Sequence, residues 1–101
     1  MRIRASCAGR ALRLYFDGEL DHHAAKRAMG EIEGYIDSRL PRDCVIDLGG
    51  LTFMDSSGIA VILKAYRRMH DIGGRLGVER VTGQPRRVID AAGIERLISI
   101  A

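Results

Sequence analysis

Apolar and polar residues alternate near the N-terminus, and this period of two predicts two strands. The alternation runs over residues 2–7 and returns over residues 11–16. Gly9 and Arg10 lie between the two runs and give a turn signal. Because the connection is so short, we expect the two strands to pair as an antiparallel hairpin. Residues 17–19 (DGE) break the alternation, so the second strand is expected to end before them.

The period then changes to that of a helix, which the pattern predicts from His22 to about Leu40. Asp21 is the residue type that caps a helix N-terminus, and Pro41 ends the helix. Gly30 and Gly34 lie four residues apart inside it. Since each costs roughly 1 kcal/mol relative to alanine in a helix, we expect them to allow a close approach to the sheet.

A short apolar run, residues 44–48, predicts a buried strand that is apolar on both faces and lies at the centre of the sheet. The Gly49–Gly50 pair that follows is predicted to form part of a loop. Residues 55–58 (DSSG) come next, and helical spacing of apolar residues begins at once over residues 59–69. Two hydroxyls and a carboxylate are therefore expected where a buried strand leads into a helix.

The remaining chain predicts a short strand over residues 76–81, a helix entered at residues 82–85 and ended by Gly93, and a last strand over residues 97–100. Ile94 is counted with the apolar side of that helix. The order β-β-α-β-α-β-α-β predicts an α/β fold, a mixed, mainly parallel sheet of about five strands with helices packed against it. Residues 1–101 are expected to form a single domain.

Composition excludes several classes of function. Hydrophobic residues make up 47% of the 101 residues and charged residues 29%, as in an ordinary globular protein. The net charge is +3, but the arginines are scattered and there is no tryptophan for stacking on bases, so we expect no nucleic-acid partner. Apolar runs are too short for a membrane span or a signal peptide, which leads us to expect a cytoplasmic protein with no membrane partner.

Metal and cofactor sites are not predicted. Cys7 and Cys44 are too far apart in sequence for a zinc or disulfide framework, and Cys44 is expected in the core. His22 and His23 are neighbours on a helix, so their side chains point about 100° apart and cannot both bind one ion in the usual way. We expect both histidines at an exposed helix start.

The join at residues 55–58 has two interpretations. The first N–H groups of a helix lack partners within it and carry partial positive charge, and aspartate and serine accept hydrogen bonds from them. A phosphate on such a serine would meet the same donors and the same dipole. A simple cap is the more common reason for these residue types at a helix start, and a phosphate-bearing serine is the alternative.

Several segments together resemble the anti-sigma factor antagonists of the STAS domain family. They are residues 18–23 (GELDHH), 51–59 (LTFMDSSGI), 61–63 (VIL) and 72–74 (IGG). The resemblance implies a switch protein and not an enzyme, with Ser56 as the phosphorylated residue. It implies that the unphosphorylated form binds an anti-sigma factor with serine kinase activity and so frees a sigma factor. The resemblance further implies that phosphorylation ends that binding and that a serine phosphatase resets it.

The expected partner-binding surface combines the helix start after residue 54 with the neighbouring turn before the first helix. Its residues are Leu20, Asp21, His22, His23, Asp55, Ser56, Ser57, Gly58, Ile59 and Ile62. Ser57 is the rival phosphate acceptor. Ile59 is either an exposed apolar anchor or a core residue, and the sequence leaves both open.

Other functions remain as alternatives. A related STAS switch in a stress-response pathway is one of them, and a nucleotide-binding module is another, although Gly49–Gly50 and Gly73–Gly74 match neither common phosphate-binding fingerprint. A serine hydrolase would need glycine where Met54 stands. The family usually continues with one more helix, whereas this sequence ends at Ala101. We therefore expect a monomer with an exposed apolar patch over residues 97–100, or dimerisation over that patch.

Overall fold

The computed structural model describes residues 1–101 and contains five strands and three α-helices in the predicted order. A short 3-10 helix, Ile94–Arg96, precedes the last strand. The elements are β1 (Arg2–Ala8), β2 (Ala11–Leu20), α1 (His22–Arg39), β3 (Asp43–Met54), α2 (Ser56–Asp71), β4 (Arg75–Glu79), α3 (Gly83–Ala92) and β5 (Ser99–Ile100).

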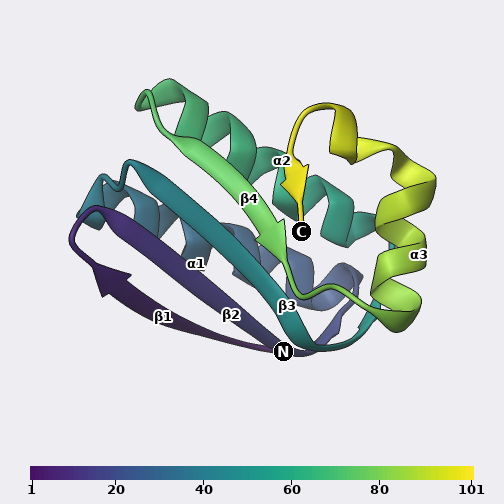
Figure 1. Ribbon diagram of the computed structural model, residues 1–101. Coiled ribbons are helices and arrows are strands. Elements are labelled where there is room, and N and C mark those ends of the chain that lie inside the picture. The colour runs from purple at the N-terminus through teal and green to yellow at the C-terminus, as the bar shows by residue number, and fades with distance from the viewer.

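The five strands form one sheet in the order β1-β2-β3-β4-β5, so the chain adds strands from one edge to the other (Figure 1). β1 and β2 pair antiparallel, which confirms the predicted hairpin. The pairs β2–β3, β3–β4 and β4–β5 are all parallel. The fold class is therefore the mixed, mainly parallel α/β sheet that the pattern predicts, with β3 at its centre.

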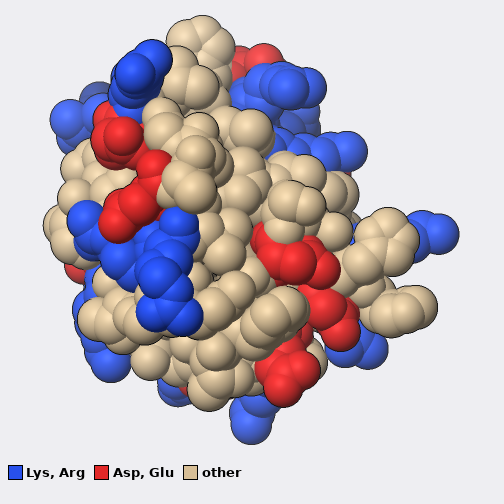
Figure 2. Space-filling view, turned by 90° about the vertical axis from the view of Figure 1, so that its right-hand side faces the viewer, with Lys and Arg blue, Asp and Glu red and all other residues tan.

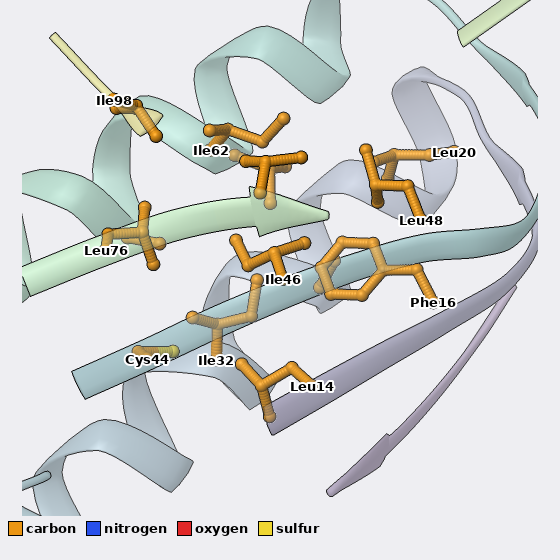
Figure 3. Close-up of a cluster of buried hydrophobic side chains, with 14 of the residues drawn as sticks. Leu14, Phe16, Leu20, Ile32, Cys44, Ile46, Leu48, Ile62, Leu76 and Ile98 are labelled. Carbon is orange, nitrogen blue, oxygen red and sulfur yellow. The ribbon is translucent and has the colours of Figure 1, made fainter. Parts of the chain in front are cut away.

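Helices α1 and α2 cover one face of the sheet, and α3 lies beside the end of β3 (Figure 1). Between the sheet and the helices, 24 apolar residues form one buried cluster. Leu14 and Phe16 of β2 and Ile46 of β3 point to the helices, where Ile32 of α1 meets them (Figure 3). Cys44 is buried there as expected, and burial raises the pKa of its thiol to about 12.

The opposite face of the sheet carries charged side chains, so β3 is not apolar on both faces as the sequence suggested. Asp47 lies on this face and is only 2% exposed, because Arg13 of β2 binds its carboxylate at 2.8 Å and also binds Glu79 of β4 at 2.9 Å. Burial by itself would raise the pKa of Asp47. Hydrogen bonds from the Gly49 N–H and Arg13, with the charge of Arg80, outweigh it and hold that pKa below its usual range.

The prediction of a loop at Gly49–Gly50 is wrong, because β3 continues through both glycines to Met54. These glycines make room for side chains of neighbouring segments. A Cβ atom on Gly50 would overlap the Asp17 carboxylate, and one on Gly49 would lie 2.6 Å from the guanidinium of Arg80. β2 also runs past residues 17–19 to Leu20, with a register shift against β3.

The glycines of α1 do not approach the sheet. Gly30 and Gly34 are not buried, and a Cβ atom at either position would meet no atom within 4 Å. The predicted half-buried pattern of β1 is also wrong beyond Ile3, because β1 lies at the sheet edge and Ala5 and Cys7 are exposed.

The C-terminal segment differs from the expected exposed strand. β5 contains only Ser99 and Ile100, and Ile98 is 1% exposed and belongs to the core. Leu97 is exposed, so the expected apolar patch is reduced to this side chain and the half-buried Ile100. Ile94 follows the end of α3 at Gly93, which adopts the left-handed conformation predicted for a helix-ending glycine.

Candidate functional site

Two helix starts lie side by side where β2 and β3 end. Leu20 and Met54 are register partners in the parallel pair, and each is followed by one aspartate and then a helix. The Asp55 N–H donates to the Leu20 carbonyl at 3.3 Å, which joins the two connections directly. Because the two strands are parallel and paired to their last residue, α1 and α2 both present their N-termini at this edge of the sheet.

Asp21 and Asp55 are the caps of these helices, as the sequence predicts for Asp21 and allows for the join at Asp55. The Ala24 N–H donates to the Asp21 carboxylate at 2.9 Å, and the Ser57 N–H donates to the Asp55 carboxylate at 2.8 Å. The bond from Ala24 is the main reason that the pKa of Asp21 lies below its usual value, and the nearby His23 lowers it further.

Ser56 is the first residue of α2, exposed, and its hydroxyl makes no hydrogen bond within the protein. Ser57 differs from it, because it is half-buried and its Oγ lies 3.5 Å from Nδ1 of His22 on α1. Of the two hydroxyls, the one on Ser56 is therefore accessible and without a partner. Since Asp55 already caps the helix, a cap does not require the Ser56 side chain.

Three of the expected surface residues are buried. Leu20 and Ile62 are 0% exposed, and Gly58 is also buried. A Cβ atom on Gly58 would overlap the side chain of Met54, so Gly58 lets α2 pack against the end of β3. These three residues pack below the surface and support the site. Because they are buried, they are not part of the surface that another protein can contact.

The remaining expected residues lie at the surface of this edge. His22, His23 and Ser56 are exposed, whereas Ile59 is half-buried and packs partly against the core. Ile59 is thus intermediate between the two interpretations that the sequence left open. Phe53 is an apolar residue that the sequence reasoning passed over: it is 38% exposed at the end of β3. Its place one residue before the buried Met54 gave a signal, since side chains on a strand alternate.

The start of α3 completes the site through Gln84. Its side-chain amide accepts from the Met54 N–H and donates to the Met54 carbonyl, both at 2.8 Å. Between α2 and α3 lies an open hollow of about 530 Å³. The residues that line it are Ser56, Ile59, Gln84, Arg87, Val88, Ala91 and Ala92. Neither Gln84 nor Arg87 stood out in the sequence, where each lies more than 25 positions from the join that it faces.

No three histidine, cysteine, aspartate or glutamate side chains gather closely enough to hold a metal ion. None of the helices is long and apolar enough to cross a membrane. Figure 2 looks at the end of the molecule where α3 lies, and it shows acidic side chains next to basic ones on its left side and a second acidic group right of centre, with neutral surface between. The chemical feature that the arrangement offers is an unbonded hydroxyl at the positive end of a helix.

Comparison with known protein families identifies the class of proteins to which this fold and this site belong. The STAS domain family model matches residues 2–101, and the chain belongs to the STAS domain family. An anti-sigma F factor antagonist of Paenibacillus polymyxa is 35% identical over 83 residues, which cover 82% of this chain and 71% of the relative.

Two solved structures of one antagonist also match. The anti-sigma factor antagonist SpoIIAA in its unphosphorylated form is 25% identical, with a TM-score of 0.84 and coverage of 99% of this chain and 88% of that one. The Bacillus cell fate determinant SpoIIAA in the phosphorylated form is 25% identical, with a TM-score of 0.74 and coverage of 99% and 91%. The chain is therefore similar to proteins that antagonise an anti-sigma factor.

Proposed function

We propose that residues 1–101 act as one STAS domain that antagonises an anti-sigma factor under the control of phosphorylation at Ser56. In its unphosphorylated form the protein binds an anti-sigma factor that is also a serine kinase, and this binding frees a sigma factor. The kinase then phosphorylates Ser56 and ends the interaction, and a serine phosphatase restores the starting state. The protein is the substrate of these enzymes and needs no cofactor of its own.

The observation that carries this proposal is the state of the Ser56 side chain. It is exposed on the first residue of α2 and bonded to nothing. A kinase active site can reach such a hydroxyl without unfolding the helix. The phosphate would then lie near the positive dipole end of α2, which stabilises an anion.

The charge of the phosphate is expected to act on the partner more than on the domain. A phosphoserine carries about −1.5 to −2 charges at neutral pH. Asp21 and Asp55 lie at the same edge, so the added charge joins two carboxylates there. Both forms of SpoIIAA resemble this fold, which supports a switch without refolding. A partner surface that packs against the bare serine would then meet repulsion and a buried anion.

Ser57 is the competing acceptor, and the structure gives reasons against it. Its side chain is half-buried, and its Oγ lies within 3.5 Å of His22. Its backbone N–H is already bound by Asp55. Modification of Ser57 would have to disturb these contacts, whereas modification of Ser56 disturbs none.

The test is phosphorylation of the purified protein by its cognate anti-sigma factor and ATP, followed by intact-mass measurement. We expect one added phosphate on the wild type and on Ser57→Ala, and none on Ser56→Ala. In a pull-down with the same partner, Ser56→Ala should stay bound in the presence of ATP, and Ser56→Asp should bind poorly. Phosphorylation of Ser56→Ala at the wild-type rate would contradict the choice of Ser56.

Sigma F and sporulation are the proposed pathway, because the named relative antagonises an anti-sigma F factor and is 35% identical. The alternative is a STAS switch in a stress response. Copurification from the source organism separates them, since the anti-sigma factor that elutes with Ser56→Ala identifies the sigma factor under control.

A further inference from the structure

The hollow between α2 and α3 is the surface next to Ser56, and its lining combines apolar residues with one arginine. Ile59, Val88, Ala91 and Ala92 make it largely apolar, and Ser56 lies at its edge. Its side chains come from α2 and α3, and the hydrogen bonds of Gln84 tie the start of α3 to Met54, the last residue of β3 before α2 begins. The hollow is thus preformed when the serine is bare.

Arg87 is the only charged residue in the lining of this hollow. It is exposed and forms no ion pair within the protein. Its neighbour Arg86 is different, since Arg86 Nε donates to the carboxylate of Asp90 at 3.1 Å on the same helix. An unpaired guanidinium beside apolar surface is complementary to a ligand that brings both a carboxylate and an apolar side chain.

We propose that this hollow is a docking surface for an acidic segment of the anti-sigma partner, and that Arg87 pairs with a carboxylate of that segment. The inference rests on the proposed function and adds the contact through which phosphorylation acts. A phosphate on Ser56 lies at the edge of the same hollow and pairs with Arg87 itself. The partner's carboxylate then loses its cation and faces an anion.

The charge of the lining changes sign in this scheme. With Ser56 bare, Arg87 gives the lining one positive charge. A phosphoserine adds about −1.5 to −2 charges, so the lining becomes negative by roughly half to one charge. An acidic segment is attracted to the first state and repelled from the second, and the positions of the helices need not change. A switch without movement of the helices agrees with the similarity of this fold to both the unphosphorylated and the phosphorylated form of SpoIIAA.

The binding test compares substitutions of Arg87 with matched controls in unphosphorylated protein. The probe is the purified anti-sigma factor of the same organism, and the readout is its dissociation constant. We expect Arg87→Ala to weaken binding by about threefold and Arg87→Glu by about tenfold. Arg86→Ala removes a neighbouring arginine, and Arg10→Glu makes the same charge change in the turn between β1 and β2. Both controls should bind within about twofold of the wild type.

A second measurement tests the contact without the partner. Phosphoserine is installed genetically at position 56, and its second pKa, ordinarily about 6, is followed by phosphorus NMR. We expect this pKa to be higher in Arg87→Ala than with Arg87 present, because the guanidinium favours the doubly charged phosphate. Arg86→Ala should leave it unchanged.

Two results would overturn the inference: equal affinity of Arg87→Glu and the wild type, or a phosphoserine pKa that does not respond to Arg87→Ala. Failure of the proposed function looks different. In that case the unphosphorylated wild type would not bind the anti-sigma factor at all, whichever residue stands at position 87.

Discussion

The two helices that start at the functional edge have the same cap and carry different residues behind it. Asp21 before α1 and Asp55 before α2 have nearly the same extended backbone, with φ and ψ of −94° and −174° in the first and −106° and −172° in the second. Each carboxylate accepts a hydrogen bond from the first turn of its helix. The two helices α1 and α2 therefore begin with the same kind of N-cap.

The residues behind the cap distinguish the two helices. In α1 they are a pair of exposed histidines, and a Cβ atom on either glycine of this helix, Gly30 or Gly34, would enter open space. In α2 the first residue is an unbonded serine, and Gly58 is buried beneath Met54. The comparison teaches that a capping aspartate marks where a helix begins but does not mark a functional site. The close packing of α2 against β3, which holds Ser56 at the surface, makes that helix start distinctive.

Substitution of Gly58 gives the largest expected change in this comparison. Gly58→Ala should destabilise the protein by about 1–3 kcal/mol, because the added Cβ would overlap Met54 and press against Leu20 at 3.1 Å. An alanine in an ordinary helix interior has the opposite effect. Urea unfolding of the variant measures this change. A variant as stable as the wild type would show that α2 does not need close contact with the end of β3.

Removal of a cap is expected to have a smaller effect. Asp55→Ala should lower the free energy of unfolding by about 1 kcal/mol, because the Ser57 N–H loses its acceptor. Asp21→Ala is expected to act in the same direction through Ala24. Urea unfolding at neutral pH measures both variants. Loss of stability in only one of them would break the equivalence of the two helix starts.

The contribution of Asp21 should also depend on pH in a defined direction. Its pKa is lowered in the folded protein, so its contribution is present above the pKa of the unfolded chain, about 3.9. That contribution is lost as the pH falls through the lower folded value. The difference in stability between Asp21→Ala and the wild type should therefore shrink below about pH 4. A difference that stays constant down to about pH 2 would exclude the carboxylate as its source.

The smallest expected change is a gain in stability in α1. Gly30→Ala and Gly34→Ala should each stabilise the protein by about 0.5–1 kcal/mol, since the new Cβ meets no atom and alanine favours the helix. Thermal unfolding gives the sign. A loss of stability at either position would mean that this face of α1 contacts something, and the contrast with Gly58 would disappear.

Local signals predicted most of the elements. Hydrophobic periodicity placed α1 and the antiparallel hairpin, Asp21 placed a cap, and Gly93 placed a helix end. These features depend on residues within one or two turns of each other, so they can be inferred from a single sequence. The location of the join between β3 and α2 could be inferred in the same way.

The wrong predictions concern contacts between segments that are distant in sequence. Gly49 and Gly50 resemble turn residues, but their role depends on Arg80 and Asp17, which only the folded sheet brings near them. Gln84 reaches the backbone of Met54 across 30 positions, and no local pattern indicates such a bond. Ile62 is an exception, because it lies on the buried stripe of α2, and the helical period alone could have excluded it from the surface.

The double hydrogen bond of Gln84 has a consequence for the rate at which a partner associates. One side-chain amide satisfies both polar groups of Met54 in the way that an adjacent strand would, and it does so from the first turn of α3. The start of α3 is therefore already held in place in the free protein, and no rearrangement of this helix has to precede binding of a partner. Association should then proceed as the meeting of two rigid bodies, with most changes in affinity appearing as changes in the lifetime of the complex.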